Sequence, residues 1–142
     1  MKQIKMMLMA VVCMLIPATT FADDKPIAPD ALPAAAKTFI QANFPGKKII
    51  FAEKDYGDYE CHLDDGTELT FNRKGNWDKV DCKTTAVPTA IVPEAIKKYV
   101  QTNFPGTLIT KIDKERWGIE IELSNNLDLK FNYQGVLIGM DD

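Results

Sequence analysis

Side chains that could act as nucleophiles or bases are few in this sequence. It has one histidine, His62, and one serine, Ser124, which fall in different parts of the chain. A serine nucleophile needs a histidine within hydrogen-bonding distance, and nothing in the spacing brings these two together. Cys61 adjoins His62, but neighbouring residues of a strand point to opposite faces of a sheet. The sequence therefore predicts no catalytic residues, no cofactor and a protein that is not an enzyme.

Metal ligands are also sparse in the sequence. Zinc sites use clusters of cysteine and histidine, and His62 with the separate Cys61 and Cys82 is too small a set. Calcium takes roughly six to eight oxygen ligands, whereas residues 64–66 (Asp-Asp-Gly) are better explained as a turn. No metal site is predicted.

These residues belong to an internal repeat. Residues 32–82 align with residues 92–142 at a constant offset of 60 and without a gap, with 17 identities in 51 positions. Chance does not produce this agreement, so the chain contains two copies of one unit. We predict these segments: a signal peptide (1–22), a first repeat (23–82), a linker (83–91) and a second repeat (92–142).

The first 22 residues have the pattern of a signal peptide. Two lysines precede an apolar run over residues 6–16, which is too short to span a bilayer, and small residues suit cleavage after Ala22. Residues 23–142 carry a net charge of −5, because the leader holds two of the 17 basic residues and none of the 20 acidic ones. Affinity for nucleic acid comes mainly from Lys and Arg, so that class is excluded. We expect a periplasmic or secreted protein without a membrane span after cleavage, and its oligomeric state stays open.

Each repeat is expected to open with a helix and to continue as alternating strands. Apolar residues at i, i+3, i+4 and i+8 mark one helical stripe in residues 36–44 and 96–104, and the Phe-Pro step ends both helices. Period-two alternation predicts half-buried strands at 59–63 and 119–123, each followed by a hairpin turn and further strands. The fold class is α+β, with two tandem helix-plus-four-strand repeats and both helices on one face of the sheet.

Cys61 and Cys82 fall on the second and fourth strands predicted for the first repeat. A strand between them places them about 9–10 Å apart, whereas a disulfide wants Cα atoms within about 7 Å. Pairing is therefore not expected, but it stays open in case the strand order differs.

The motifs of the first repeat are Leu32-Pro33, Asn43-Phe44-Pro45-Gly46, Asp65-Gly66, Phe71-Asn72 and Gly75. This order, repeated behind a signal peptide, resembles the PepSY-like proteins, which are grouped structurally with beta-lactamase-inhibitor-protein-like domains. The resemblance covers residues 28–142. It implies one curved, eight-stranded antiparallel sheet with helices on its convex side, in a periplasmic protein. Some relatives hold or inhibit another protein against the concave face, and the PepSY family is associated with restraint of peptidases.

Binding is the function that these features favour. We predict a non-catalytic module that holds an unidentified protein or peptide on the polar concave sheet face, with inhibition of a peptidase or other enzyme as one form of that role. The alternative is small-ligand or cation binding on the acidic sheet face. The candidate binding residues are exposed aromatic side chains and polar positions of the strands: Tyr56, Glu60, His62, Asn72, Trp117, Glu120, Glu122, Asn132 and Tyr133.

Overall fold

Residues 24–142 are the part of the chain that the computed structural model describes, and they form two α-helices, two 3₁₀ turns and nine strands. The predicted signal peptide, residues 1–22, lies outside them. The first repeat contains β1 (Asp24–Pro26), η1 (Pro29–Ala31), α2 (Ala34–Asn43), β2 (Ile49–Asp55), β3 (Asp58–Leu63), β4 (Glu68–Phe71) and β5 (Trp77–Asp81). The second contains η2 (Thr89–Ile91), α3 (Glu94–Asn103), β6 (Ile109–Lys114), β7 (Gly118–Leu123), β8 (Asp128–Asn132) and β9 (Leu137–Asp141).

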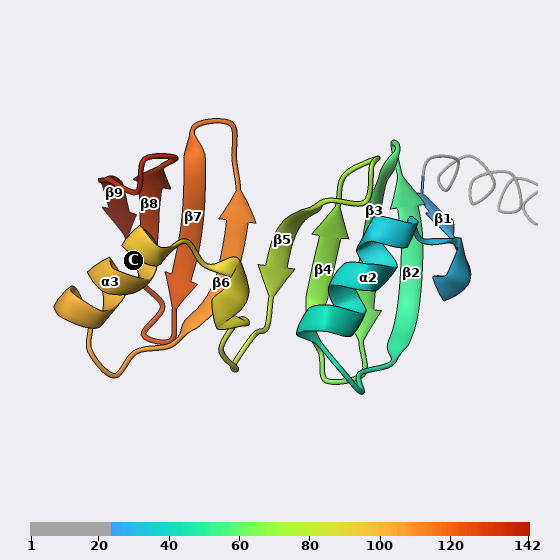
Figure 1. The fold of residues 1–142 in the computed structure, drawn as a ribbon, viewed down its shortest axis with the longest axis horizontal. Helices are drawn as coiled ribbons and strands as arrows, with labels where there is room; N and C mark the ends of the chain where they lie inside the picture. The colour runs from blue at the N-terminus through green and yellow to red at the C-terminus, as the bar shows by residue number, and fades with distance from the viewer. Residues whose placement is uncertain (1–23) are drawn as a thin grey trace, which may run out of the picture.

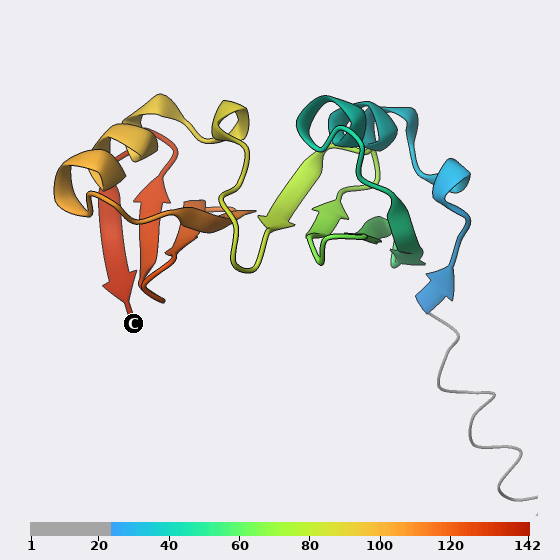
Figure 2. The same ribbon diagram turned by 90° about the horizontal axis from the view of Figure 1, so that it is seen from below.

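The strands form one antiparallel meander in the order β1 to β9 (Figure 1). Figure 2 shows α2 and α3 on the same side of this sheet. The predicted α+β class with both helices on one face is therefore confirmed. The sheet has nine strands where eight were expected, because β1 adds to the outer edge of β2, with Asp24 opposite Asp55. This strand has three residues and ends in Pro26, so it carries no alternation that a sequence pattern could show.

The two helices begin and end at equivalent residues. Pro33 and Pro93 precede their first residues, and the chain leaves the helical conformation at Phe44 and Phe104. The fixed φ of proline suits a helix start, while the residue before a proline is disfavoured in the α region. The helical phase directs the apolar stripe of each helix onto the sheet, and its buried members are Ala36, Ile40, Ile96 and Val100.

The core lies between the helices and the sheet. Phe71 and Phe131 are fully buried at equivalent positions of the two repeats. An aromatic side chain of the overlying helix meets each of them edge-on, Phe39 at 5.8 Å and Tyr99 at 5.4 Å between ring centres. Phe39 and Tyr99 thus pack against the core from the apolar stripe of each helix.

The hairpin register agrees with the alternation in the sequence. Cys61 lies opposite Leu69 across the pair β3–β4, and Phe71 lies opposite Trp77 across β4–β5, where a bulge shifts the pairing. Cys61 and Cys82 are both buried and both free thiols. The two repeats join through β5 and β6, where Val80 lies opposite Ile112.

Candidate binding face

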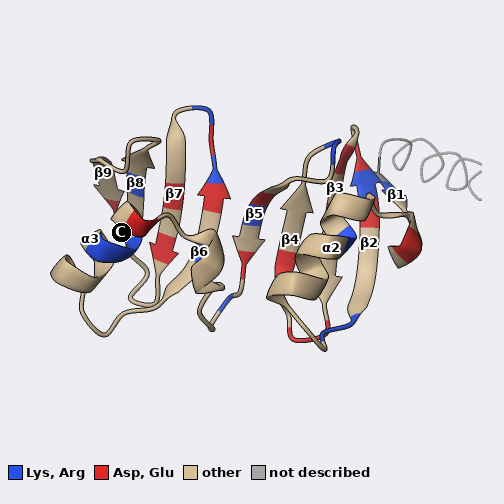
Figure 3. Ribbon diagram, in the orientation of Figure 1, with Lys and Arg blue, Asp and Glu red and all other residues tan. Residues whose placement is uncertain are grey.

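The side of the sheet away from the helices carries a band of charged residues, which we call the polar face. No helix among residues 24–142 covers it (Figures 1 and 2). Its acidic members, placed by strand alternation, are Glu53, Asp55, Asp58, Glu60, Glu68, Asp81, Asp113, Glu120, Glu122, Asp128 and Asp141. Its lysines are Lys79, Lys111 and Lys130, and Lys83 reaches it from the turn after β5. Acidic residues therefore dominate this face, and Figure 3 marks the positions of acidic residues along strands of both repeats.

Glu60, His62 and Glu68 form one cluster on the polar face. Glu60 and His62 are two apart on β3 and so share a face, and His62 lies directly opposite Glu68 of β4. The His62 Nε2 atom is 2.8 Å from Glu60 Oε1, and the candidate ligand atoms of the three residues all lie within 4.8 Å of one another. Lys83 also reaches this cluster, with its Nζ atom 3.2 Å from Glu68 Oε2. The donor set is one imidazole and two carboxylates, none of them deeply buried.

Asp113, Glu115 and Glu120 form a second, purely carboxylate cluster, again within 4.8 Å. Partial burial raises the pKa of Asp113, and the neighbouring Glu115 raises it further. Partial burial likewise raises the pKa of Glu120, with a second contribution from Asp128. Crowded carboxylates repel one another, and a cation placed among them would relieve that repulsion.

The polar face is shallow. A hollow of only about 20 Å³ lies on it, among Lys111, Asp113, Glu120, Glu122 and Asp128. Small-molecule sites typically enclose about 300–1,000 Å³. The face is thus an open surface on which a broad partner can lie, with room for ions between the carboxylates.

The predicted aromatic residues lie in turns and not on the polar face. Tyr56 is 77% exposed in the turn between β2 and β3. Trp117 and Tyr133 lie in the turns β6–β7 and β8–β9, and the Tyr133 hydroxyl donates a hydrogen bond to the Glu115 carbonyl oxygen. The Lys130 Nζ atom is 6.0 Å from the centre of the Trp117 ring. The structure thus groups Trp117 and Tyr133 near the second carboxylate cluster, while Tyr56 belongs to the first repeat.

Asn72 and Asn132 have a structural task that the sequence prediction did not assign to them. The Oδ1 atom of Asn72 accepts hydrogen bonds from the backbone N–H groups of Lys74 and Asn76. The Oδ1 atom of Asn132 does the same for the N–H groups two and four residues on. This repeated pattern fixes the turns β4–β5 and β8–β9.

Residues that the sequence prediction missed lie in β2, in β6 and directly after β6. Phe51 stacks edge-on with His62 on the polar face, with 5.4 Å between ring centres, and Asp113 and Glu115 complete the second cluster. A bulge near the start of each strand, between Ile49 and Phe51 in β2, interrupts the alternation there. Counting the alternation of polar and apolar residues from after the bulge in each strand would have placed Phe51 and Asp113 on the polar face.

Cys61 is poorly suited to nucleophilic chemistry. Burial raises the pKa of its thiol to about 12, and the nearby Glu60 carboxylate contributes. Thiolates, and not thiols, are the nucleophilic form.

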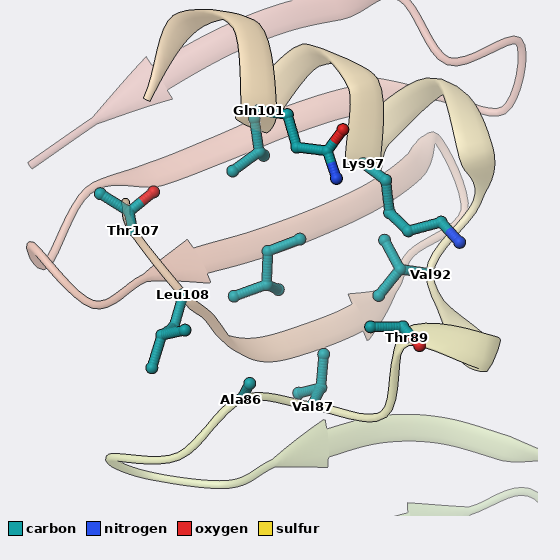
Figure 4. Close-up of a pocket in the computed structure, with 10 residues that line it drawn as sticks. Ala86, Val87, Thr89, Val92, Lys97, Gln101, Thr107 and Leu108 are labelled. Carbon is teal, nitrogen blue, oxygen red and sulfur yellow. The ribbon is translucent and has the colours of Figure 1, made fainter. Parts of the chain in front are cut away.

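An apolar pocket lies on the helix side, between α3, the linker and the segment before β6. Its volume is about 170 Å³. Figure 4 shows Val87, Val92 and Leu108 around it, with Lys97 and Gln101 of α3 at its edge. The Nζ atom of Lys97 is already paired with Glu94 at 3.0 Å. This pocket is smaller than typical small-molecule sites.

Comparison with models of protein families shows which family the chain belongs to. Residues 20–71 and 57–139 match the family described as "Putative beta-lactamase-inhibitor-like, PepSY-like". The chain belongs to the PepSY-like family. The two matches overlap over residues 57–71 and together extend across both repeats, so the PepSY-like unit occurs in tandem, and the resemblance noted in the sequence is confirmed.

Solved structures of similar proteins come from Bacteroides species. A "putative calcium-regulated periplasmic protein" from Bacteroides thetaiotaomicron is 40% identical, with a TM-score of 0.80 over 84% of this chain and 97% of that one. A "putative periplasmic protein" of the DUF2874 family from Bacteroides vulgatus is 42% identical, with a TM-score of 0.80 over 85% and 98%. A second protein from Bacteroides vulgatus, 35% identical, has a TM-score of 0.79 over 84% and 99%. All three are described as periplasmic, in agreement with the predicted location.

Two further findings concern the curated proteins and membrane-spanning helices. None of the curated proteins matches this PepSY-like chain. Within residues 24–142, neither helix has the length and apolar character that crossing a bilayer requires.

Proposed function

We propose that this PepSY-like protein is a non-catalytic periplasmic binding module that holds a protein or peptide on its polar face. One observation supports this most directly: both helices lie on one side of the sheet, and the other side is left as a broad, acidic, shallow surface. Open surfaces of this kind suit extended macromolecular partners better than small substrates.

The charge of the polar face indicates the chemistry of the partner. By strand alternation the acidic residues of this face outnumber its lysines, and complementary charge favours a basic partner and accelerates its association. The half-buried Glu60, Glu120 and Glu122 lie on the central strands of the two half-sheets. Two exposed aromatic residues are candidate anchors: Phe51 contacts His62 of the first cluster, and Trp117, in the turn β6–β7, lies beside Lys130 of this face. A peptidase or another enzyme held on this face would be inhibited wherever the contact covers its active site.

A pull-down from the native host's periplasmic extract tests the proposal. The baits are residues 23–142 and the double variant Glu60→Lys, Glu120→Lys, which reverses one charge in each repeat of the polar face. The matched control is Asp30→Lys, Glu94→Lys, which makes the same charge change at exposed positions outside that face. A protein retained by the wild type and the control, and lost with the polar-face variant, supports the proposal. Equal capture by all three baits contradicts it.

Calcium binding on the same face is the second candidate. The cluster of Asp113, Glu115 and Glu120 supplies the carboxylate oxygens that calcium prefers, and a 40% identical relative is described as calcium-regulated. Calorimetric titration with CaCl₂ tests it, with MgCl₂ as the competing cation. Saturable heat from calcium that Asp113→Asn abolishes supports this candidate, and heat that is unchanged in the variant contradicts it.

A further inference from the structure

Strand β9 forms one edge of the sheet. Leu137–Asp141 pair with β8 on one side, and no strand among residues 24–142 lies along the other side. Large apolar side chains are exposed in and beside this strand: Val136 by 58%, Ile138 by 54% and Met140 by 46%. An exposed edge strand with apolar side chains is a template for pairing with another strand.

The opposite edge of the sheet is protected in a way that β9 is not. Strand β1 has three residues, and its sequence is Asp-Lys-Pro. Short length, lysine and proline are the features that prevent edge pairing. Strand β9 has five residues and contains neither proline nor lysine.

In the first repeat, the strand equivalent to β9 is β5, and it is paired with β6 along this edge. At the offset of 60, β9 corresponds to β5 and Met140 corresponds to Val80. Val80 is fully buried, because β6 pairs along β5 and places Ile112 opposite it. Met140 has no such neighbour among residues 24–142 and is 46% exposed. The junction β5–β6 is therefore an internal template for the strand that β9 lacks.

We propose that β9 binds an extended peptide strand, antiparallel, in the way that β5 binds β6. The pairing of β5 with β6 indicates which side chains the peptide carries. An apolar residue lies opposite Met140, as Ile112 lies opposite Val80, and a lysine lies opposite Asp141, as Lys111 lies opposite Asp81. The Asp141 carboxylate is 3.3 Å from the Lys130 Nζ atom, but the Asp141 side chain is 63% exposed and so stays accessible to a second lysine. The ligand is thus an extended segment with a Lys-apolar step.

A second copy of this chain fits the edge less well. Two β9 strands paired with each other cannot place a lysine opposite Asp141, because β9 contains none. A contact along one five-residue strand also buries far less than the roughly 1,200 Å² of a stable protein interface. The peptide is therefore the favoured occupant.

The test uses a labelled peptide with the sequence of residues 107–116 (TLITKIDKER), which contains β6. Fluorescence anisotropy measures its binding to residues 23–142. We expect saturable binding that Asp141→Lys weakens about twofold to fivefold, the range of a single cross-strand charge pair. A peptide carrying Lys111→Asp should bind the Asp141→Lys protein better than the wild-type protein.

A control separates this edge from the polar face as a whole. Glu60→Lys makes the same charge change far from β9 in the strand order and should not reverse the preference between the two peptides. Absence of saturable binding, or binding that Asp141→Lys leaves unchanged, overturns the proposal. So does a dimer, seen by analytical ultracentrifugation, that Met140→Lys dissociates, because the edge would then belong to a second copy.

Discussion

The Nζ atom of Lys114 lies 3.8 Å from the centre of the Trp77 ring. Trp77 belongs to β5 of the first repeat, and Lys114 belongs to β6 of the second. The Trp77 ring also packs against Phe39 of α2, with 6.1 Å between ring centres. Partial burial lowers the pKa of Lys114, which the nearby Asp78 partly offsets. The two repeats are thus joined by packed side chains as well as by strand pairing.

This contact predicts a loss of stability when the cation is removed. Lys114→Gln should lower the free energy of unfolding by about 0.5–1 kcal/mol, the usual size of a partly exposed cation–π contact. Guanidinium unfolding followed by tryptophan fluorescence measures it. Lys98→Gln, at an exposed position of α3, is the control and should change little. Equal effects of the two variants would show that the contact contributes nothing.

The crowded carboxylates predict that neutralising Asp113 makes the protein more stable, by an amount that depends on pH. Burial and Glu115 raise the pKa of Asp113, so the native state favours the protonated form more than the unfolded chain does. Stability from this group is therefore full at low pH and is lost as pH rises through the raised pKa. Asp113→Asn should raise Tm at pH 7, modestly because solvent screens the site, and the gain should vanish near pH 3. A gain that is the same at both pH values would contradict this origin.

The free thiols predict slow alkylation of the native protein. Burial raises the pKa of Cys61 to about 12 and also raises that of Cys82. Few thiolates then form at pH 8, and we expect iodoacetamide to label the native chain at least about 100-fold more slowly than the unfolded chain. Mass spectrometry after labelling measures both rates. Rapid native labelling, or a mass lower by two hydrogens, would contradict free, buried thiols.

The helix-to-turn contact predicts that two equivalent glycines cannot be replaced. A Cβ atom at Gly75 would lie 2.8 Å from the Pro33 Cβ atom, and one at Gly135 would lie 2.6 Å from the Ala95 Cβ atom. Alanine at either position should cost more than about 1 kcal/mol of unfolding free energy. Gly66, with a similar φ of +92° and nothing within 4 Å, is the matched control. A cost for Gly66→Ala as large as for the other two would assign the effect to φ alone.

Alternation in the sequence predicted the interior of the sheet well. The hairpin β3–β4 has the pairing expected from its three-residue turn, with Cys61 opposite Leu69, because one buried face fixes the register. Because the two repeats align at a constant offset of 60, each strand assigned in one repeat was supported by the equivalent strand of the other. The candidate residues Glu60 and Glu120 could be placed on one face for the same reason.

The parts that could not be predicted are those where alternation fails. Bulges at the starts of β2 and β6 shift the parity of these strands, so Phe51 and Asp113 were not assigned to the polar face. Strand β1 is too short to show a period. The aromatic candidate Tyr56 lies in a turn with a φ of 49°, and strand alternation does not extend into a turn.

The central claim is that the polar face is the surface that meets the partner. Photo-crosslinking in the native periplasm tests it directly, with a photoreactive residue replacing Glu122 on the polar face or Lys98 on the outer side of α3. Our account predicts a covalent adduct from position 122 and none from position 98. An adduct from position 98 alone, or equal adducts from both positions, would contradict it.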